Sequence, residues 1–196
     1  MYLGEVISSM KKYADENNIP IMMNDGIEFL LDYIYKNKIK NILEIGTAIG
    51  YSAIRMCSVS SDIIVTSIER DEARYLEAVK NVKKAGLEDR IVLIYKDAFD
   101  VSLNDNYDLI FIDAAKAQNI NFFEKFEYFL KPKGTIITDN MNFHGLVGSD
   151  DKIKSRNLRQ LVRKVEKYKN FLESNTSYHT SFYDIGDGIA VSVKKD

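Results

Sequence analysis

The sequence predicts an α/β protein with a mostly parallel, seven-stranded sheet, helices on both faces and an antiparallel hairpin strand at the C-terminal end. Strand-like and helix-like segments alternate from Asn41 onward, which is typical of a parallel sheet. Two runs, Asp108–Asp113 and Gly134–Asp139, are too apolar for strands with a face in water. Gly186-Asp-Gly188 lies between apolar segments and indicates an antiparallel hairpin.

Hydrophobic periodicity and helix-ending residues define the individual elements. Amphipathic helices are expected over Leu3–Glu16 and Asp25–Asn37, so that residues 1–37 form an N-terminal helical cap segment. The expected strands are Asn41–Ile45, Ile63–Ile68, Ile91–Tyr95, Tyr107–Ile112, Thr135–Thr138, Tyr178–Ile185 and Ile189–Val193. The other expected helices are Gly50–Val59, Asp71–Ala85 with Gly86 as its cap, Ile120–Leu130 and the basic Ile153–Leu172.

Length and composition limit the class of protein. A chain of 196 residues supports one sizeable core, so we expect a single domain over residues 1–196. The net charge of −2 gives no general nucleic-acid signature. A lone cysteine, Cys57, excludes a disulfide framework, and no apolar run is long enough for a signal peptide or a membrane span. These observations predict a cytoplasmic protein without a membrane partner.

Acidic and amide side chains follow two of the predicted buried strands. Asp113 ends one strand, and Asp139 and Asn140 end another. The carboxyl ends of parallel strands form the ligand crevice of an open α/β sheet. If the two strands are neighbours, their oxygen ligands suit a hard cation such as Mg²⁺. Lys116 lies just beyond the first acid and is a candidate base for a reaction near that cation.

A glycine-containing turn follows the first predicted strand. Glu44, Gly46 and Gly50 are spaced as E-x-G-x-x-x-G, and the helix that follows offers unpaired N–H groups. The spacing matches neither the dinucleotide fingerprint G-x-G-x-x-G nor a Walker loop. The turn is therefore either a ligand-binding loop or a tight turn needed for packing.

Two further acids stand at the ends of the next strands. Glu69 can accept hydrogen bonds from both hydroxyls of a ribose, or it can favour the N-terminus of the next helix. Asp97, before Ala98, can meet an adenine amino group or serve only as a turn residue. Together the strand ends point to a nucleotide more strongly than any one of them.

The order of these motifs resembles the metal-dependent O-methyltransferases, which use S-adenosylmethionine (SAM) and include the catechol and caffeoyl-CoA enzymes. Within that family the chain is most similar to the bacterial tRNA 5-hydroxyuridine methyltransferases. The residues that carry this closer resemblance are Phe111-Ile-Asp-Ala-Ala-Lys116, Phe122-Phe123 and Arg156-Asn-Leu-Arg159. The resemblance implies a Rossmann-like SAM-dependent methyltransferase fold and a homodimer.

The resemblance also implies a role for each motif. Glu44, Gly46 and Ser52 would hold the methionine part of SAM, Glu69 its ribose, and Asp97 and Ala98 its adenine. Met22 would cover the cofactor, although a core methionine is an equally good interpretation. Asp113, Asp139 and Asn140 would bind the cation (Mg²⁺, or Mn²⁺ or Ca²⁺), with Asp113 also bordering the cofactor, and Lys116 would be the general base.

The methyl acceptor is the least determined part of the prediction. Between Lys152 and Lys169 the chain carries many basic residues, and Arg156, Arg159 and Arg163 share one helix face. Such a face can bind phosphate or can simply be solvated. His144 is a further candidate contact for the substrate. We expect methylation of 5-hydroxyuridine to 5-methoxyuridine at the tRNA wobble position. A small catechol-like or caffeoyl-like phenol is the first alternative, and a non-catalytic nucleotide-binding protein is the second.

Overall fold

A computed structural model of the chain describes residues 2–142 and 155–196. The helices are α1 (Leu3–Asn17), α2 (Asn24–Lys36), α3 (Tyr51–Cys57), α4 (Glu72–Ala85), α5 (Asn119–Phe126) and α6 (Arg156–Ser174). The strands are β1 (Asn41–Ile45), β2 (Ile64–Glu69), β3 (Ile91–Tyr95), β4 (Tyr107–Ile112), β5 (Leu130–Thr138), β6 (Tyr178–Tyr183) and β7 (Ile189–Lys194). Short 3-10 turns span Ala98–Asp100 (η1), Lys116–Gln118 (η2) and Glu127–Phe129 (η3).

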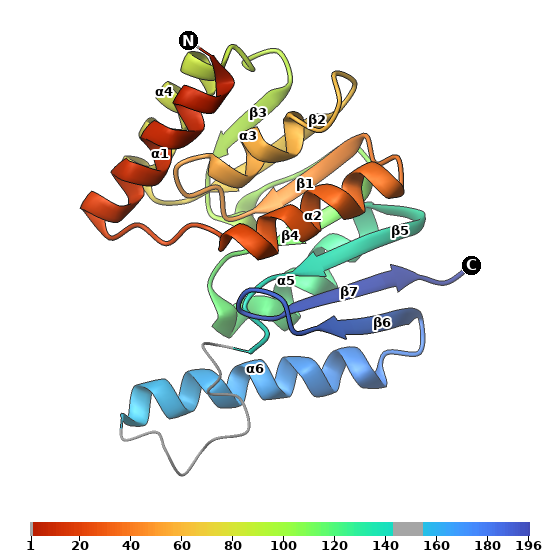
Figure 1. The fold of residues 1–196 in the computed structure, drawn as a ribbon. Coiled ribbons are helices and arrows are strands. Elements are labelled where there is room, and N and C mark those ends of the chain that lie inside the picture. The colour runs from red at the N-terminus through yellow and green to blue at the C-terminus, as the bar shows by residue number, and fades with distance from the viewer. Residues whose placement is uncertain (1, 143–154) are drawn as a thin grey trace.

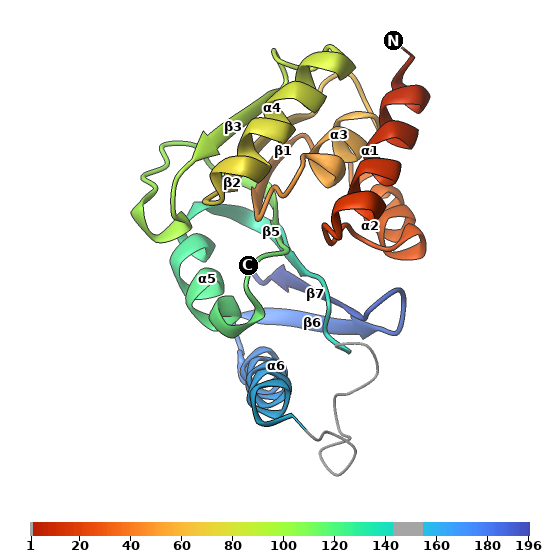
Figure 2. The ribbon, with the colours of Figure 1, turned by 90° about the vertical axis from the view of Figure 1, so that its left-hand side faces the viewer.

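The strands of the described residues form one seven-stranded sheet in the order β3-β2-β1-β4-β5-β7-β6 (Figures 1 and 2). β1 to β5 pair in parallel, whereas β7 runs antiparallel to both of its neighbours. The predicted fold class, with a mostly parallel sheet and an antiparallel C-terminal pair, is therefore confirmed.

Helices cover both faces of the sheet because successive side chains of the buried strands point to opposite faces. Ile42 of β1 packs in a core with α1, α2 and α3, whereas its neighbour Leu43 packs in a second core with α5 and α6. Leu109 and Ile110 of β4 divide between the same two cores. The second core is rich in aromatic rings, and Phe123 meets Tyr178 at 4.9 Å between ring centroids.

The strand register brings the predicted site residues to one edge. Ile45 of β1 pairs with Ile112 of β4, and Ile112 pairs with Thr138 of β5. Asp113 directly follows Ile112, and Asp139 directly follows Thr138. The condition for a shared cation site, that these two strands are neighbours, is met.

The end of one helix and the start of the strand that follows it differ from the prediction. The helix expected over Ile120–Leu130 ends at Phe126 and continues as the η3 turn, because Leu130 already pairs with Tyr107 as the start of β5. The register of β5 then shifts before Thr135, and Lys133 takes a positive φ of 60° within this irregular part.

The first strand of the hairpin is shorter at its end than expected, and the basic helix extends two residues further, to Ser174. β6 stops at Tyr183, so the connection to β7 is the five-residue loop Asp184–Gly188. In the described chain α6 begins at Arg156, with Ser155 accepting a hydrogen bond from the Leu158 amide, and the expected start at Ile153 lies outside the described residues. Within residues 2–142 and 155–196, no helix has the length and apolar character that crossing a membrane requires.

Candidate active site

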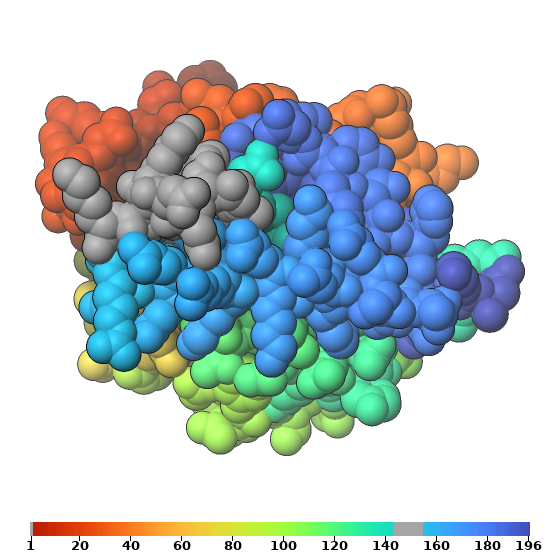
Figure 3. Space-filling view, turned by 90° about the horizontal axis from the view of Figure 1, so that it is seen from below, coloured from red at the N-terminus to blue at the C-terminus, as the bar shows by residue number. Residues whose placement is uncertain are grey.

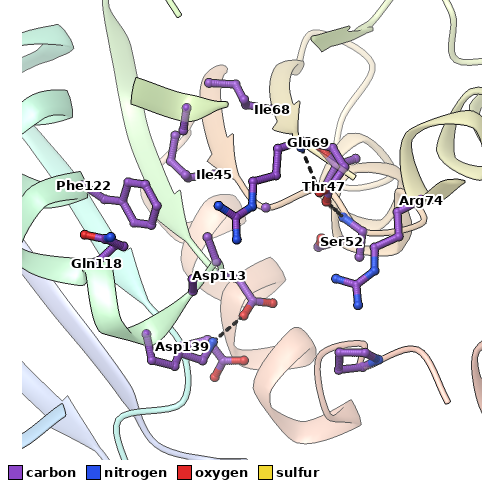
Figure 4. A pocket seen from close by; sticks show the side chains of 18 of the residues that line it. Ile45, Thr47, Ser52, Ile68, Glu69, Arg74, Asp113, Gln118, Phe122 and Asp139 are labelled. Atoms are coloured by element: carbon purple, nitrogen blue, oxygen red, sulfur yellow. Dashed lines mark hydrogen bonds and ion pairs between the residues drawn. The ribbon is translucent and has the colours of Figure 1, made fainter. Parts of the chain in front are cut away.

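A cavity of about 660 Å³ opens at the carboxyl ends of the parallel strands (Figure 4). The predicted site residues that line it are Met22, Gly46, Ser52, Glu69, Asp97, Ala98, Asp113, Lys116, Asp139 and Asn140. Figure 4 shows Asp113 and Asp139 close together, with Glu69 and Ser52 on another side of the cavity. The volume lies within the range of small-molecule and cofactor sites.

The first turn of the site requires glycine. Gly46 has a φ of +101°, and a Cβ atom there would lie 2.3 Å from the Asp113 carbonyl oxygen. The ends of β1 and β4 therefore approach each other more closely than any side chain at this position allows. Two reasons therefore favour glycine at position 46: the positive φ of the backbone and the lack of space for a Cβ atom.

The Glu69 side chain accepts backbone hydrogen bonds just before α4 and also borders the cavity. Its Oε1 accepts hydrogen bonds from the amides of Arg70 and Asp71, both at 2.9 Å, just before α4 begins. Its Oε2 accepts a hydrogen bond from the Ala48 amide of the glycine loop at 2.8 Å. The carboxylate is thus fixed by three backbone donors and still lines the cavity.

Glu44 lies behind the cavity wall and is not among the residues that line it. The side chain is fully buried and accepts hydrogen bonds from the hydroxyls of Ser52 and Ser67. Burial raises the pKa of Glu44 to about 8, and the two serine hydrogen bonds oppose this shift. Glu44 therefore supports Ser52, which does line the cavity.

The two strand-end acids lie in different electrostatic surroundings. Asp113 forms an ion pair with Lys116, with 2.9 Å between Oδ1 and Nζ. Asp139 is only 3% exposed, and burial together with the nearby Asp113 carboxylate raises the pKa of Asp139 to about 7. Asn140 follows in the left-handed conformation with a φ of 62°, which asparagine tolerates better than most residues.

Asp187 lines the same cavity and was missed by the sequence reasoning. It lies in the β6–β7 loop and accepts a hydrogen bond from the Asn140 side-chain amide, with 3.2 Å between Nδ2 and Oδ2. Backbone hydrogen bonds of 2.8 Å from Met141 to Gly188 and from Asn142 to Asp187 join the two segments. The sequence signal for Asp187 is the acid in Gly186-Asp-Gly188, and that pattern by itself predicts only a hairpin.

The predicted adenine-binding residues lie beside an aromatic pair. Asp97 accepts a hydrogen bond from the Phe99 amide at 2.9 Å and forms an exposed ion pair with Arg70. Phe99 and Phe122 stack with their ring centroids 4.9 Å apart. Asp97 is thus a turn residue that also borders the cavity. Met22 is 6% exposed and lines the cavity while packing in the first core. Its interpretation as a core methionine is confirmed, and its role as a cover for the cofactor stays a prediction.

The arginines of α6 form a separate pocket. Arg156, Arg159 and Arg163 line it together with Gln160. α6 packs against the η2 turn, which contains Lys116. The helix lies below the sheet in Figure 1 and runs along the face seen in Figure 3. The predicted substrate residue His144 lies outside the described residues, as do Lys152 and Lys154 of the basic segment.

A sequence profile described as O-methyltransferase matches residues 1–195. The chain belongs to the O-methyltransferase family. Family membership confirms the predicted enzyme class, a SAM-dependent O-methyltransferase.

Individual members of the O-methyltransferase family are similar over nearly the whole chain. A caffeoyl-CoA O-methyltransferase from Populus kitakamiensis is 28% identical, covering 94% of this chain and 82% of that protein. The structure of a candidate caffeoyl-CoA O-methyltransferase from Staphylococcus aureus is 41% identical, with a TM-score of 0.92 over 96% of this chain and 91% of that chain. An O-methyltransferase from Bacillus cereus, solved with S-adenosylhomocysteine (SAH), is 25% identical with a TM-score of 0.83, covering 97% of this chain and 91% of that chain. These similarities confirm the Rossmann-like methyltransferase fold. None of these three proteins is named for a tRNA substrate.

Proposed function

We propose that the enzyme transfers a methyl group from SAM to a hydroxyl that has a neighbouring oxygen, with a divalent cation held by Asp113, Asp139 and Asn140. The observation that carries this proposal is the β1–β4–β5 register, which sets the two carboxylates side by side at the cavity. A divalent cation bound there supplies positive charge that stabilises an oxyanion of the acceptor.

The donor set fits a hard cation by its chemistry. Two carboxylate side chains and one amide oxygen are the ligand types that Mg²⁺, Mn²⁺ and Ca²⁺ prefer. In the described part of the chain, no group of three His, Cys, Asp or Glu residues is arranged for a metal, so the third protein ligand in this proposal is the amide oxygen of Asn140. Because the Asn140 nitrogen donates to Asp187, its oxygen is left for the cation.

Lys116 is the proposed general base. Its Nζ now donates to Asp113, and its side chain is only 15% exposed, so the amine is held beside the cation ligands. A divalent cation held by Asp113 would compete with Lys116 for this carboxylate, and its positive charge would favour the neutral amine over the ammonium. The neutral Nζ, once its proton has gone to solvent, could accept the proton of the acceptor hydroxyl.

The remaining cavity residues position the methyl donor. The Glu69 carboxylate accepts hydrogen bonds from the ribose hydroxyls, Gly46 and Ser52 hold the methionine part, and Asp97 and Ala98 border the adenine. Since methyl transfer needs the acceptor oxygen in line with the methyl carbon, positioning of the two reactants accounts for a large share of the rate.

The proposed acceptor is 5-hydroxyuridine at the wobble position of tRNA, whose 5-hydroxyl and 4-carbonyl are neighbouring oxygens. The supporting observation is the arginine-lined pocket on α6, which packs against the turn that carries Lys116. Arginines bind phosphate oxygens in a forked geometry, so this pocket suits an acceptor with phosphates near the methylated group.

A small phenol with two neighbouring oxygens is the second candidate. It is favoured by the similarity to proteins named as caffeoyl-CoA O-methyltransferases. Coenzyme A also carries phosphates, so the α6 pocket suits a caffeoyl-CoA-like thioester as well as a tRNA. The arginine pocket therefore does not distinguish the two candidates. An assay of which acceptor is methylated does.

Nucleoside mass spectrometry separates the two acceptors. Total tRNA from cells that lack this protein is incubated with the enzyme, SAM and Mg²⁺, and caffeoyl-CoA and catechol are assayed in parallel. We expect 5-methoxyuridine to form at the expense of 5-hydroxyuridine. Methylation of a phenol with no change in the tRNA nucleosides would replace the tRNA proposal with the small-molecule one.

Charge-matched variants test the arginine pocket. The double variant R156Q/R163Q should raise the KM for tRNA and reduce its dependence on salt. The control K164Q/K167Q removes two exposed charges of α6 that do not line the pocket. An equal effect of both variants would indicate only general attraction of the polynucleotide.

The homodimer implied by the family resemblance is also part of the proposal. Sedimentation equilibrium at micromolar protein concentration tests it directly, and a mass equal to one chain of 22.5 kDa would contradict it.

A further inference from the structure

Arg74 is a cavity residue to which neither the sequence motifs nor the family resemblance gives a role. It lies in the first part of α4 and lines the main cavity. Figure 4 shows its guanidinium on the Ser52 side, across the cavity from Gln118 and Phe122. The side chain thus faces the end of the site that is proposed to hold the methionine part of SAM.

The packing of α4 determines this position. Ala78, one turn further along α4, lies against the glycine loop, and a Cβ added at Gly50 would be 3.4 Å from the Ala78 Cβ. Residues four apart share a helix face, so Arg74 extends from the same face beside the loop. The helix begins at a fixed point because the Asp71 side chain accepts a hydrogen bond from the Arg74 amide at 2.9 Å.

The charges of the cavity wall single out Arg74. Five acidic residues line the cavity: Glu69, Asp97, Asp113, Asp139 and Asp187. Two of the basic residues in the wall have acidic partners, because Lys116 pairs with Asp113 and Arg70 pairs with Asp97. Within the residues that the structure describes, no carboxylate forms an ion pair with Arg74.

This arrangement complements the charges of SAM. The sulfonium and the ammonium group of SAM are positive and suit an acidic cavity, whereas its single carboxylate needs a positive partner at the methionine end. Ser52 lies at that end, but a hydroxyl carries no charge. Lys96, the other cavity cation that forms no ion pair within the described residues, follows β3 beside Asp97, at the proposed adenine end.

We propose that Arg74 binds the α-carboxylate of SAM and of SAH. The inference rests on the proposed placement of the methionine part at Gly46 and Ser52. Arg74 thereby gives the site its discrimination for a cofactor with an intact amino-acid group over 5′-thioadenosine compounds that lack the carboxylate.

A ligand without the carboxylate tests this assignment. Calorimetry measures the affinity of the full-length enzyme for SAH and for S-adenosyl-3-thiopropylamine, which lacks only the carboxylate. We expect R74Q to bind SAH roughly 10- to 100-fold more weakly than the wild type, as for loss of a charged hydrogen bond, and to bind the amine with nearly unchanged affinity. R74K should recover part of the loss for SAH.

The control is R70Q, which removes the neighbouring cation at the proposed adenine end and should affect both ligands equally. Equal loss for both ligands in R74Q, or no loss for either, would overturn the assignment. A rise in KM for the acceptor with unchanged SAH affinity would also overturn it and would place a phosphate of the acceptor at Arg74. Failure of the wild type to bind SAH at all would instead contradict the proposed function.

Discussion

The side-chain amide of Asn140 donates a hydrogen bond to the carboxylate of Asp187, a residue 47 positions away in the sequence. Asp187 is only 5% exposed, and two backbone hydrogen bonds join its loop to the segment after Asn140. Gly188 permits this contact, since a Cβ there would lie 2.6 Å from the Asn142 amide nitrogen. The β6–β7 loop therefore fixes the side chain that we propose as a cation ligand.

Asp187→Ala should weaken Mn²⁺ binding by roughly 10- to 100-fold, because the amide of Asn140 loses its orienting partner. Electron paramagnetic resonance of free Mn²⁺ measures the affinity without an activity assay. Asp184→Ala is the matched control, since Asp184 lies in the same loop and accepts a hydrogen bond from the side-chain amide of Asn142 but does not line the cavity. Equal Mn²⁺ affinities of the two variants would contradict an orienting role for Asp187.

Glu44 makes stability depend on pH. Its pKa is raised from an ordinary value of 4.5 to about 8, so its contribution to stability is fully present below pH 4.5 and is lost as pH rises toward 8. Glu44→Gln keeps the hydrogen-bonding shape of the neutral acid without its ionisation. We expect the stability of E44Q relative to wild type to increase from pH 5 to pH 8 by a few kcal/mol, about 1.4 kcal/mol for each pKa unit.

Urea denaturation at several pH values measures this difference in the free energy of unfolding. Asp139 also has a raised pKa, but it is present in both proteins and cancels in the comparison. Parallel stability curves for the two proteins would show that Glu44 is ionised in the folded state across this range.

Gly46→Ala should destabilise the protein by several kcal/mol, because the added Cβ would meet the Asp113 carbonyl oxygen at 2.3 Å in addition to the cost of a positive φ. Gly86→Ala is the control for the backbone cost alone, since Gly86 has a φ of +65° and open space around it. Its expected cost is about 1 kcal/mol. Equal midpoints of urea unfolding for the two variants would refute the steric argument.

Lys116→Met should lower kcat by about 10²- to 10⁴-fold while leaving the affinity for SAH within a few-fold of wild type, because the residue acts on the acceptor proton. Single-turnover kinetics and calorimetry measure the two quantities. Lys96→Met removes another lysine of the cavity wall at the proposed adenine end and should retain kcat. Retention of kcat by K116M would exclude Lys116 as the base.

The strand ends could be predicted from the sequence because buried parallel strands are recognisable as apolar runs and their carboxyl ends share one edge. This reasoning placed Asp113, Asp139 and Asn140 correctly at the cavity. It could not find Asp187, because no local pattern shows which strand end a distant loop contacts. Arg74 was missed for a related reason, since an arginine on an amphipathic helix has the same pattern whether it faces solvent or a cavity.

The charge relationships inside the site also lay beyond the sequence. Lys116 could be placed near a strand end, but its ion pair with Asp113 depends on the conformation of the η2 turn. Glu44 was expected to touch the cofactor and instead supports Ser52 from behind the wall. Both differences arise from side-chain directions, which a periodic pattern does not determine.

Cation dependence of methyl transfer tests the central claim most directly. Transfer of labelled methyl from SAM to acceptor is measured after chelation with EDTA and again after Mg²⁺ is restored, with SAH affinity recorded under both conditions. The account predicts that chelation abolishes transfer, that Mg²⁺ restores it, and that SAH binding stays within a few-fold throughout. Undiminished transfer in EDTA, to either the tRNA or the phenolic acceptor, would contradict it.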